Sequence, residues 1–280
     1  MRAFRVAYDG RPFYGFQRQP SVPTVEDSLF DALRRLGVLD ETADKPTGYA
    51  AAGRTDAGVS AVAQTVAFDP PEWCTPRALN SELPSHVRAW AAADVPADFH
   101  ATHHAVRRRY SYHLYAPTTE FDSLDGRDHV DDDRARTALD ALCGEHDFHN
   151  LTPDDTGTVR ELTGDLTRDG EFLVVRVESG GFARELVRRL VSLVQAVGSG
   201  SAPIEKIERV LGSEPIDGPE GVPPAPPTPL VLTGVDYPGV AFECDETAVA
   251  STRSVFGERA VEGRVRRRVA DTVLAAVGSE

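Results

Sequence analysis

The chain has 280 residues and a net charge of −14, and 41% of its residues are hydrophobic. This share of hydrophobic side chains supports packed cores and excludes an intrinsically disordered chain. No apolar run approaches the roughly 20 residues of a membrane helix. Residues 1–5 open a strand instead of a signal peptide, so we expect a cytoplasmic protein without membrane contact.

Metal and disulfide sites are not predicted. Cys74, Cys143 and Cys244 form no Cys-x-x-Cys pair, which indicates neither a disulfide framework nor a zinc site. Histidines gather at residues 100–104, but no carboxylate or thiol set at suitable spacing completes a metal site.

The first 105 residues alternate between strand and helix patterns. Apolar residues recur every second position in the predicted strands and at helical spacing in the predicted helices. The predicted elements are a strand over 2–9, a loop over 10–23, a helix opened by Thr24 and closed by Gly37, a strand over 62–68, a helix from Thr75-Pro76, and a strand over 86–95.

The remaining residues repeat this mixture, which predicts two similar α+β units, 1–105 and 106–280, with a C-terminal tail from about residue 245. The predicted elements are a strand over 105–115, an acidic loop over 122–133, a helix capped by Asp131 or Asp132 and ending at Gly144, a hairpin of 160–167 and 172–178, helices over 182–197 and 205–211, a proline-rich loop over 215–229, a strand over 230–237, and a helix over 264–276.

One carboxylate stands on a glycine-bracketed turn. In residues 53–59, Gly53 and Gly58 flank Asp56, and strand-like segments lie on both sides. Glycine permits a sharp turn or the close approach of a ligand. Asp56 would then point out of the sheet, where it can meet a substrate. The alternative is a tight loop with a solvated aspartate.

Two further segments combine basic residues with positions that can face a ligand. Along the strand over 105–115, Arg108 and Tyr110 share one face and Arg109 lies on the other. Arginines beside an aromatic ring suit a flipped base near phosphates, although such aromatics are often core residues. On the helix over 182–197, Arg184 and Arg188 belong to a polar stripe, which is ordinarily a solvated face.

Several motifs together resemble those of the tRNA pseudouridine synthase A (TruA) family. Residues 53–61 closely resemble the motif around that family's catalytic aspartate. The other matches occur in the family's order between about residues 6 and 237: Tyr8-Asp9-Gly10, Gly15-Phe16-Gln17-Arg18-Gln19, Thr24-Val25-Glu26, Arg109-Tyr110-Ser111-Tyr112 and Val187-Arg188.

The resemblance implies an α+β pseudouridine synthase fold. Two similar halves would share a mixed, mostly antiparallel sheet with a central active-site cleft. Asp56 would be the catalytic aspartate, and Arg188 would face it and keep it ionised. Tyr110 would pack on the target uracil, and Arg54 would help to displace that base.

The resemblance also implies the substrate and partners. The expected activity is isomerisation of uridine to pseudouridine in the tRNA anticodon stem-loop, around positions 38 to 40, by a homodimer without a metal or other cofactor. With Arg54 and Tyr110, we predict Arg109 and Arg184 as substrate-binding residues. Two alternatives are a non-catalytic RNA-binding relative and a glycosidase, although a glycosidase ordinarily needs a second carboxylate.

The acidity of the chain is unusual for a protein that binds a polyanion. Lysine occurs only at Lys45 and Lys206, so 28 of the 30 basic residues are arginine. An acidic, lysine-poor surface is expected of a protein that works in concentrated salt, where the Debye length falls to roughly 3 Å at 1 M. Local arginine contacts and stacking would then carry RNA recognition.

Overall fold

A computed structural model describes residues 1–117, 129–216 and 218–277. Its N-terminal part contains the predicted elements. The hydroxyl of Thr24 accepts a hydrogen bond from the backbone N–H of Asp27 at 3.2 Å, which caps the first helix, and Gly37 follows its end with φ 68°. The elements are β1 (Arg2–Tyr8), α1 (Val25–Arg35), β2 (Ala50–Ala51), β3 (Ser60–Phe68), α2 (Pro76–Glu82) and β4 (Val87–Asp94).

The C-terminal part also follows the prediction in most elements. Asp131 caps α3, and the acidic loop predicted over 122–133 falls mostly outside the described residues. The elements are β5 (Arg107–Tyr115), α3 (Asp132–Leu142), β6 (Gly144–Asp147), the short 3-10 helix η3 (His149–Leu151), β7 (Val159–Asp169), β8 (Phe172–Ser179), α4 (Leu186–Ser199), α5 (Glu205–Leu211), the 3-10 helix η4 (Gly218–Glu220), β9 (Leu230–Asp236), β10 (Glu243–Cys244) and α6 (Glu246–Val277).

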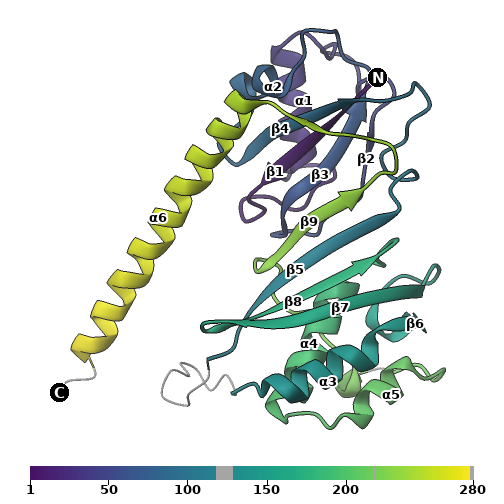
Figure 1. The fold of residues 1–280 in the computed structure, drawn as a ribbon, viewed down its shortest axis with the longest axis vertical. Coiled ribbons are helices and arrows are strands. Elements are labelled where there is room, and N and C mark those ends of the chain that lie inside the picture. The colour runs from purple at the N-terminus through teal and green to yellow at the C-terminus, as the bar shows by residue number, and fades with distance from the viewer. Residues whose placement is uncertain (118–128, 217, 278–280) are drawn as a thin grey trace.

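One ten-stranded sheet runs through the molecule (Figure 1). Its order is β10–β4–β1–β3–β9–β5–β8–β7–β6, and β2 pairs with β3. Within the described residues β3 and β9 are parallel, and the other pairs are antiparallel. The predicted α+β class with a mixed, mostly antiparallel sheet is therefore confirmed. β9 lies between β3 and β5 and so joins the N-terminal strands to the C-terminal strands.

Buried side chains form two hydrophobic cores, one on each part of the sheet. The first core contains buried hydrophobic residues between Ala3 and Ala105 together with Leu232, Val235 and Tyr237. The second contains residues from Tyr112 to Leu230 and also Val59, which comes from the aspartate-bearing turn. Tyr110 is half-buried and packs against both cores. The division of the chain into two units near residue 105 remains our proposal. β9 and β10, which come after this point in the chain, pair with β3 and β4 of the N-terminal part.

Two helix predictions were inaccurate. The helix predicted from residue 182 begins at Leu186, because Glu185 has φ 62°, a left-handed conformation that cannot continue a helix. The helix predicted over 264–276 is the end of the much longer α6, which starts at Glu246. No described helix combines the length and apolar character needed to cross a bilayer.

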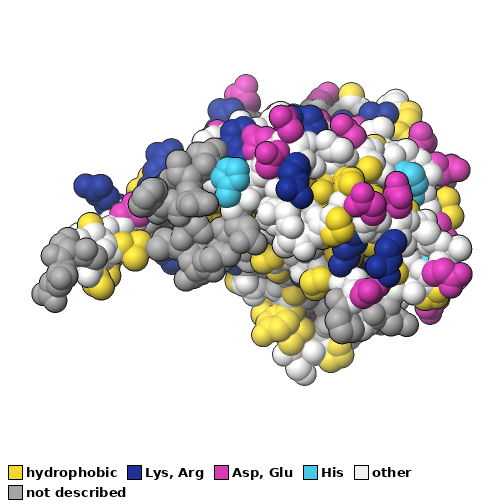
Figure 2. Space-filling model, turned by 90° about the horizontal axis from the view of Figure 1, so that it is seen from below, with side chains coloured by type: hydrophobic (Ala, Val, Ile, Leu, Met, Phe, Trp, Pro, Cys, Tyr) yellow, Lys and Arg dark blue, Asp and Glu magenta, His cyan; other side chains and the backbone are white. Residues whose placement is uncertain are grey.

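α6 starts on the N-terminal part and extends along the side of the molecule (Figure 1). Its 32 residues span about 48 Å at 1.5 Å per residue. Arg259 bonds to Asp9 at 2.6 Å, and Arg267 bonds to Glu171 of the β7–β8 turn at 2.6 Å. The helix therefore contacts both parts of the molecule. Figure 2 shows its far end standing away from a face where acidic and basic side chains are interspersed.

Candidate active site

A cleft of about 1470 Å³ lies between the two parts of the molecule. Its walls come from loops of the N-terminal part, from β5 and β9, and from the segment that leads into α4. The residues used below that line it are Arg54, Asp56, Arg108, Tyr110, Phe182, Arg184 and Arg188. Segments far apart in sequence thus meet around one solvent-accessible space.

The aspartate turn, residues 53–59, interlocks with the loop over residues 10–16. Backbone bonds run from Phe16 N–H to the Thr55 carbonyl at 3.1 Å and from Gly58 N–H to the Phe13 carbonyl at 3.2 Å. A Cβ at Gly10 would lie 2.1 Å from the Val59 carbonyl oxygen. Gly15 has φ +105°, and a Cβ there would lie 2.9 Å from the Thr55 carbonyl oxygen. These contacts give a physical reason for both glycines.

Two side chains fix the turn from the sheet side. The buried Tyr8 hydroxyl and the Thr55 hydroxyl are 2.8 Å apart, and the Gln64 amide donates to the Gly53 carbonyl at 2.9 Å. Burial raises the pKa of Tyr8, so its phenol stays protonated. Asp56 itself remains about one-third exposed, with 31% of its side chain accessible. The turn is thus held by hydrogen bonds to both the sheet and the neighbouring loop, and Asp56 lines the cleft.

Arg188 is the ion-pair partner of Asp56. Its Nη1 donates to Asp56 Oδ2 at 3.2 Å, and its side chain is 14% exposed. Its Nε donates to the Ala225 carbonyl at 2.7 Å, and the Ala225 N–H donates to the Arg188 carbonyl at 3.1 Å. The guanidinium is thereby oriented by the backbone with one edge turned to the carboxylate.

The proline-rich segment over residues 222–229 supports this pair from the other side. The Tyr112 hydroxyl donates to the Pro226 carbonyl at 3.0 Å. A Cβ at Gly58 would lie 3.0 Å from the Pro227 side chain, which places the segment directly against the aspartate turn. Proline restricts the backbone of such a segment, so it can hold both Arg188 and the turn in place.

Tyr110 extends from β5 into the wall of the cleft. Its ring meets Phe182 edge-to-face with centroids 5.2 Å apart. Burial, and secondarily the nearby charge of Asp56, raise the pKa of the Tyr110 phenol, so the group is neutral at physiological pH. Tyr110 therefore offers an apolar ring and a protonated hydroxyl beside the carboxylate.

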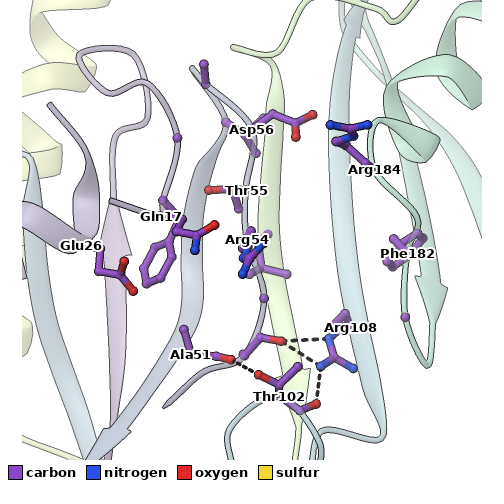
Figure 3. Close-up of a pocket in the computed structure, with 18 of the residues that line it drawn as sticks. Gln17, Glu26, Ala51, Arg54, Thr55, Asp56, Thr102, Arg108, Phe182 and Arg184 are labelled. Carbon is purple, nitrogen blue, oxygen red and sulfur yellow. Dashed lines mark hydrogen bonds between the residues drawn. The ribbon is translucent and has the colours of Figure 1, made fainter. Parts of the chain in front are cut away.

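Arg54 lines the cleft from the aspartate turn, and Arg184 lines it from the segment that leads into α4. Arg54 is exposed and, within the part of the chain that the structure describes, has no side-chain hydrogen bond or ion pair. Arg184 points toward Asp56 in Figure 3, is 59% exposed, and lies 3.4 Å from Asp154. The structure therefore brings both predicted arginines to the cleft.

Arg109 lies elsewhere. Its guanidinium forms a two-pronged ion pair with Asp236, at 2.7 and 3.0 Å, and it does not line the cleft. Arg108, which we did not assign to the site, lines the cleft instead. The alternation of β5 explains the exchange, because Arg108 shares a face with Tyr110 and Arg109 does not. That shared face was the sequence signal for Arg108.

The described residues contain no group of three or more His, Cys, Asp or Glu side chains placed to hold a metal ion. The rings of His100 and His103 lie with centroids 4.2 Å apart and are tilted by 34°, and the backbone N–H of His100 donates to Nδ1 of His104 at 3.1 Å. The cleft is lined by five arginines, Lys45 and five acidic side chains, and Asp56 is the carboxylate that pairs with Arg188.

Comparison with known proteins gives the class of the protein. A family model described as tRNA pseudouridine synthase matches residues 138–238. The tRNA pseudouridine synthase A of Haloarcula marismortui is 59% identical over 275 residues, which are 98% of each chain. Its counterpart in Halobacterium salinarum is 58% identical over 96% of this chain and 97% of that one. The counterpart in Methanosarcina acetivorans is 38% identical over 97% and 96%.

Among solved structures, an archaeal box H/ACA sRNP Nop10–Cbf5 complex matches 70% of this chain and 43% of that chain. Its TM-score is 0.33 at 16% identity.

The fold is that of a pseudouridine synthase. Because sequence identity exceeds 50% over nearly the full length of several relatives, the chain belongs to the tRNA pseudouridine synthase A family. It is therefore an enzyme, an isomerase that converts uridine to pseudouridine in tRNA.

Proposed function

We propose that this enzyme modifies uridines of the anticodon stem-loop, around positions 38 to 40, and that Asp56 is its catalytic carboxylate. The observation that supports the role of Asp56 is its ion pair with Arg188 at 3.2 Å, in a cleft that both parts of the molecule line. The reaction breaks the N-glycosidic bond, turns the base and rejoins it through carbon. It has no net redox change and needs one reactive carboxylate.

The surrounding side chains fit the other requirements of this reaction. Arg188 holds the carboxylate in its orientation through the ion pair. The Tyr110 ring, braced by Phe182, supplies a wall for the detached uracil. Extrusion of a base costs a few kcal/mol. In our proposal, Arg54 fills the space that the base leaves, and Arg184 contacts the RNA backbone from the segment that leads into α4.

Tritium release from uridine-labelled tRNA tests the role of Asp56. We expect wild type to release tritium and Asp56→Ala and Asp56→Asn to be inactive while still binding tRNA. Asp98→Ala, a change of an exposed aspartate outside the cleft, is the control and should retain activity. Normal activity in Asp56→Ala would overturn the assignment.

Substitution of the target uridines tests the anticodon stem-loop proposal. Transcripts in which cytidine replaces uridine at positions 38, 39 and 40 should release no tritium, whereas transcripts with cytidine at uridines of the other stems should remain substrates. Chemical mapping of pseudouridine in the reacted tRNA then identifies each product. Pseudouridine outside the anticodon arm alone would contradict the proposal.

We also propose a homodimer in which α6 takes part. This helix exposes six apolar side chains by about half or more: Val261, Val265, Val269, Val273, Leu274 and Val277. Apolar side chains gathered on a projecting helix are typical of a protein interface. Sedimentation at micromolar concentration should give a dimer for wild type and a monomer for V265E/V269E. V159E, at an equally exposed valine of β7, should stay dimeric, and a monomeric wild type would contradict the proposal.

A further inference from the structure

Arg108 of β5 is bound entirely by backbone carbonyls. Its Nε and Nη2 donate to the Ala52 carbonyl at 3.3 and 2.8 Å, and Nη2 also donates to the Thr102 carbonyl at 2.7 Å. Its Nη1 donates to the carbonyls of Ala105, at 3.2 Å, and Gly180. A guanidinium has five N–H groups. These five bonds use all of them.

Arg108 has no ion-pair partner among the described residues, although it is half-buried. Burial lowers its pKa, an effect that the nearby phenols of Tyr237 and Tyr110 oppose. Placing a charge in such surroundings without a carboxylate is unfavourable unless its hydrogen bonds are well satisfied. Because no N–H remains unused, Arg108 also has no donor for a phosphate of the substrate, despite lining the cleft.

The four carbonyls belong to the segments that carry the site. Ala52 immediately precedes the aspartate turn, and Gly180 precedes Phe182 and the start of α4. Thr102 and Ala105 lie in the connection between the two parts of the molecule. The Thr102 hydroxyl closes the arrangement by donating to the Ala51 carbonyl at 2.6 Å (Figure 3). The Arg108 side chain thus connects the residue before the aspartate turn with the start of the segment that leads to Arg188.

We propose that Arg108 is a positioning residue that sets the separation between the aspartate turn and the segment leading to α4, and so aligns Asp56 with Arg188. This inference rests on the catalytic role proposed for Asp56. Arg108 acts through those segments and does not bind the substrate. A lysine cannot replace it, because an ammonium has three donors at one point whereas the four carbonyls surround a planar group.

Kinetics of Arg108→Met and Arg108→Lys test this role. Misplacement of catalytic groups by about 1 Å can reduce a rate by about 100-fold. We therefore expect the single-turnover rate at saturating tRNA to fall by about that factor in both variants, while the Kd for tRNA in a filter-binding assay stays within about twofold of wild type. Arg107→Met is the matched control: Arg107 is the exposed neighbour on β5, pairs with half-buried Glu178, and lies outside the cleft.

A second variant tests the proposal if the Arg108 variants do not fold. Thr102→Val removes only the bond to the Ala51 carbonyl, and it should lower the same rate constant by a smaller factor without changing the Kd. A weakened Kd with an unchanged rate in Arg108→Met would identify a phosphate ligand and overturn the proposal. Full activity of Arg108→Lys, or of Thr102→Val where both Arg108 variants fail to fold, would also overturn it.

The same assays separate this inference from the proposed function. If Asp56→Ala is inactive and Arg108→Lys is fully active, only the positioning role is refuted. If Asp56→Ala is active, the catalytic assignment fails whatever the Arg108 variants do.

Discussion

Arg188 Nη1 lies 3.2 Å from Asp56 Oδ2, although 132 positions separate the two residues in the chain. The backbone carbonyl of Ala225 holds the other edge of the same guanidinium at 2.7 Å. The cation is therefore fixed before a substrate arrives, which is the arrangement expected for electrostatic stabilisation of a reacting carboxylate.

Replacement of Arg188 should reduce the chemical step more than binding. Arg188→Met removes both the ion pair and the bond to Ala225, and Arg188→Lys cannot make both at once. We expect the single-turnover rate to fall by about 100-fold or more with little change in the tRNA Kd. Arg136→Met, at an exposed arginine of α3, is the control. A wild-type rate in Arg188→Lys would show that the two-sided contact is unnecessary.

Substitution of Gly10 or Gly15 should damage both stability and activity. A Cβ at these positions would lie 2.1 Å and 2.9 Å from carbonyl oxygens of the aspartate turn. We expect Gly10→Ala and Gly15→Ala to lower the free energy of unfolding by about 2–4 kcal/mol, measured by urea denaturation. Gly263→Ala, on α6 with open space around it, should instead be neutral or stabilise by up to about 1 kcal/mol. Equal effects at all three sites would contradict the interlocking contact.

The stability of the protein should decline in alkali because of buried tyrosines. Burial raises the pKa of Tyr237 to about 12 from its ordinary value of 10, so the folded state retains a proton that the unfolded state loses. The contribution of Tyr237 to the free energy of unfolding is fully present below pH 10. It is lost as the pH rises toward 12, at up to about 1.4 kcal/mol per pH unit.

Urea midpoints measured from pH 8 to 11.5 at constant KCl check this decline. Tyr237→Phe loses the hydroxyl bond to the Ala101 carbonyl, at 2.6 Å, and should be less stable at pH 8. Its stability should then fall less steeply above pH 10 than that of wild type. Parallel curves for the two proteins would exclude Tyr237 as a source of the effect.

Salt should stabilise the fold. A net charge of −14 is self-repulsive in dilute buffer, and concentrated salt screens that repulsion. Circular dichroism from dilute buffer to 3 M KCl, with melting at each concentration, should show Tm rising with salt and partial unfolding at the lowest concentrations. Complete folding and an unchanged Tm in dilute buffer would count against adaptation to salt.

Local patterns determined much of the fold before any coordinates. The range of α5, the Thr24 cap and the hairpin of β7 and β8 were predicted from the sequence and are confirmed. For α3 the prediction left the cap open between Asp131 and Asp132, and the cap is Asp131. These features depend on contacts between residues close in the chain, which sequence patterns record directly. The start of α4 was not predictable in this way. Phe182 stands four positions before Leu186, which is helical spacing, but it packs on Tyr110 from a loop.

The sequence by itself predicted which residues carry chemistry: Asp56 on its glycine-bracketed turn, Tyr110 on its strand and Arg188 at a helical position. Only the tertiary structure decided which of them meet. Alternation along β5 places Arg108 and Arg109 on opposite faces of the strand. It does not predict which of the two faces borders the cleft. The insertion of β9 between β3 and β5, together with bonds from Arg108 to the distant carbonyls of Ala52 and Gly180, selects that face. Such contacts arise from packing between remote segments, for which local sequence contains no signal.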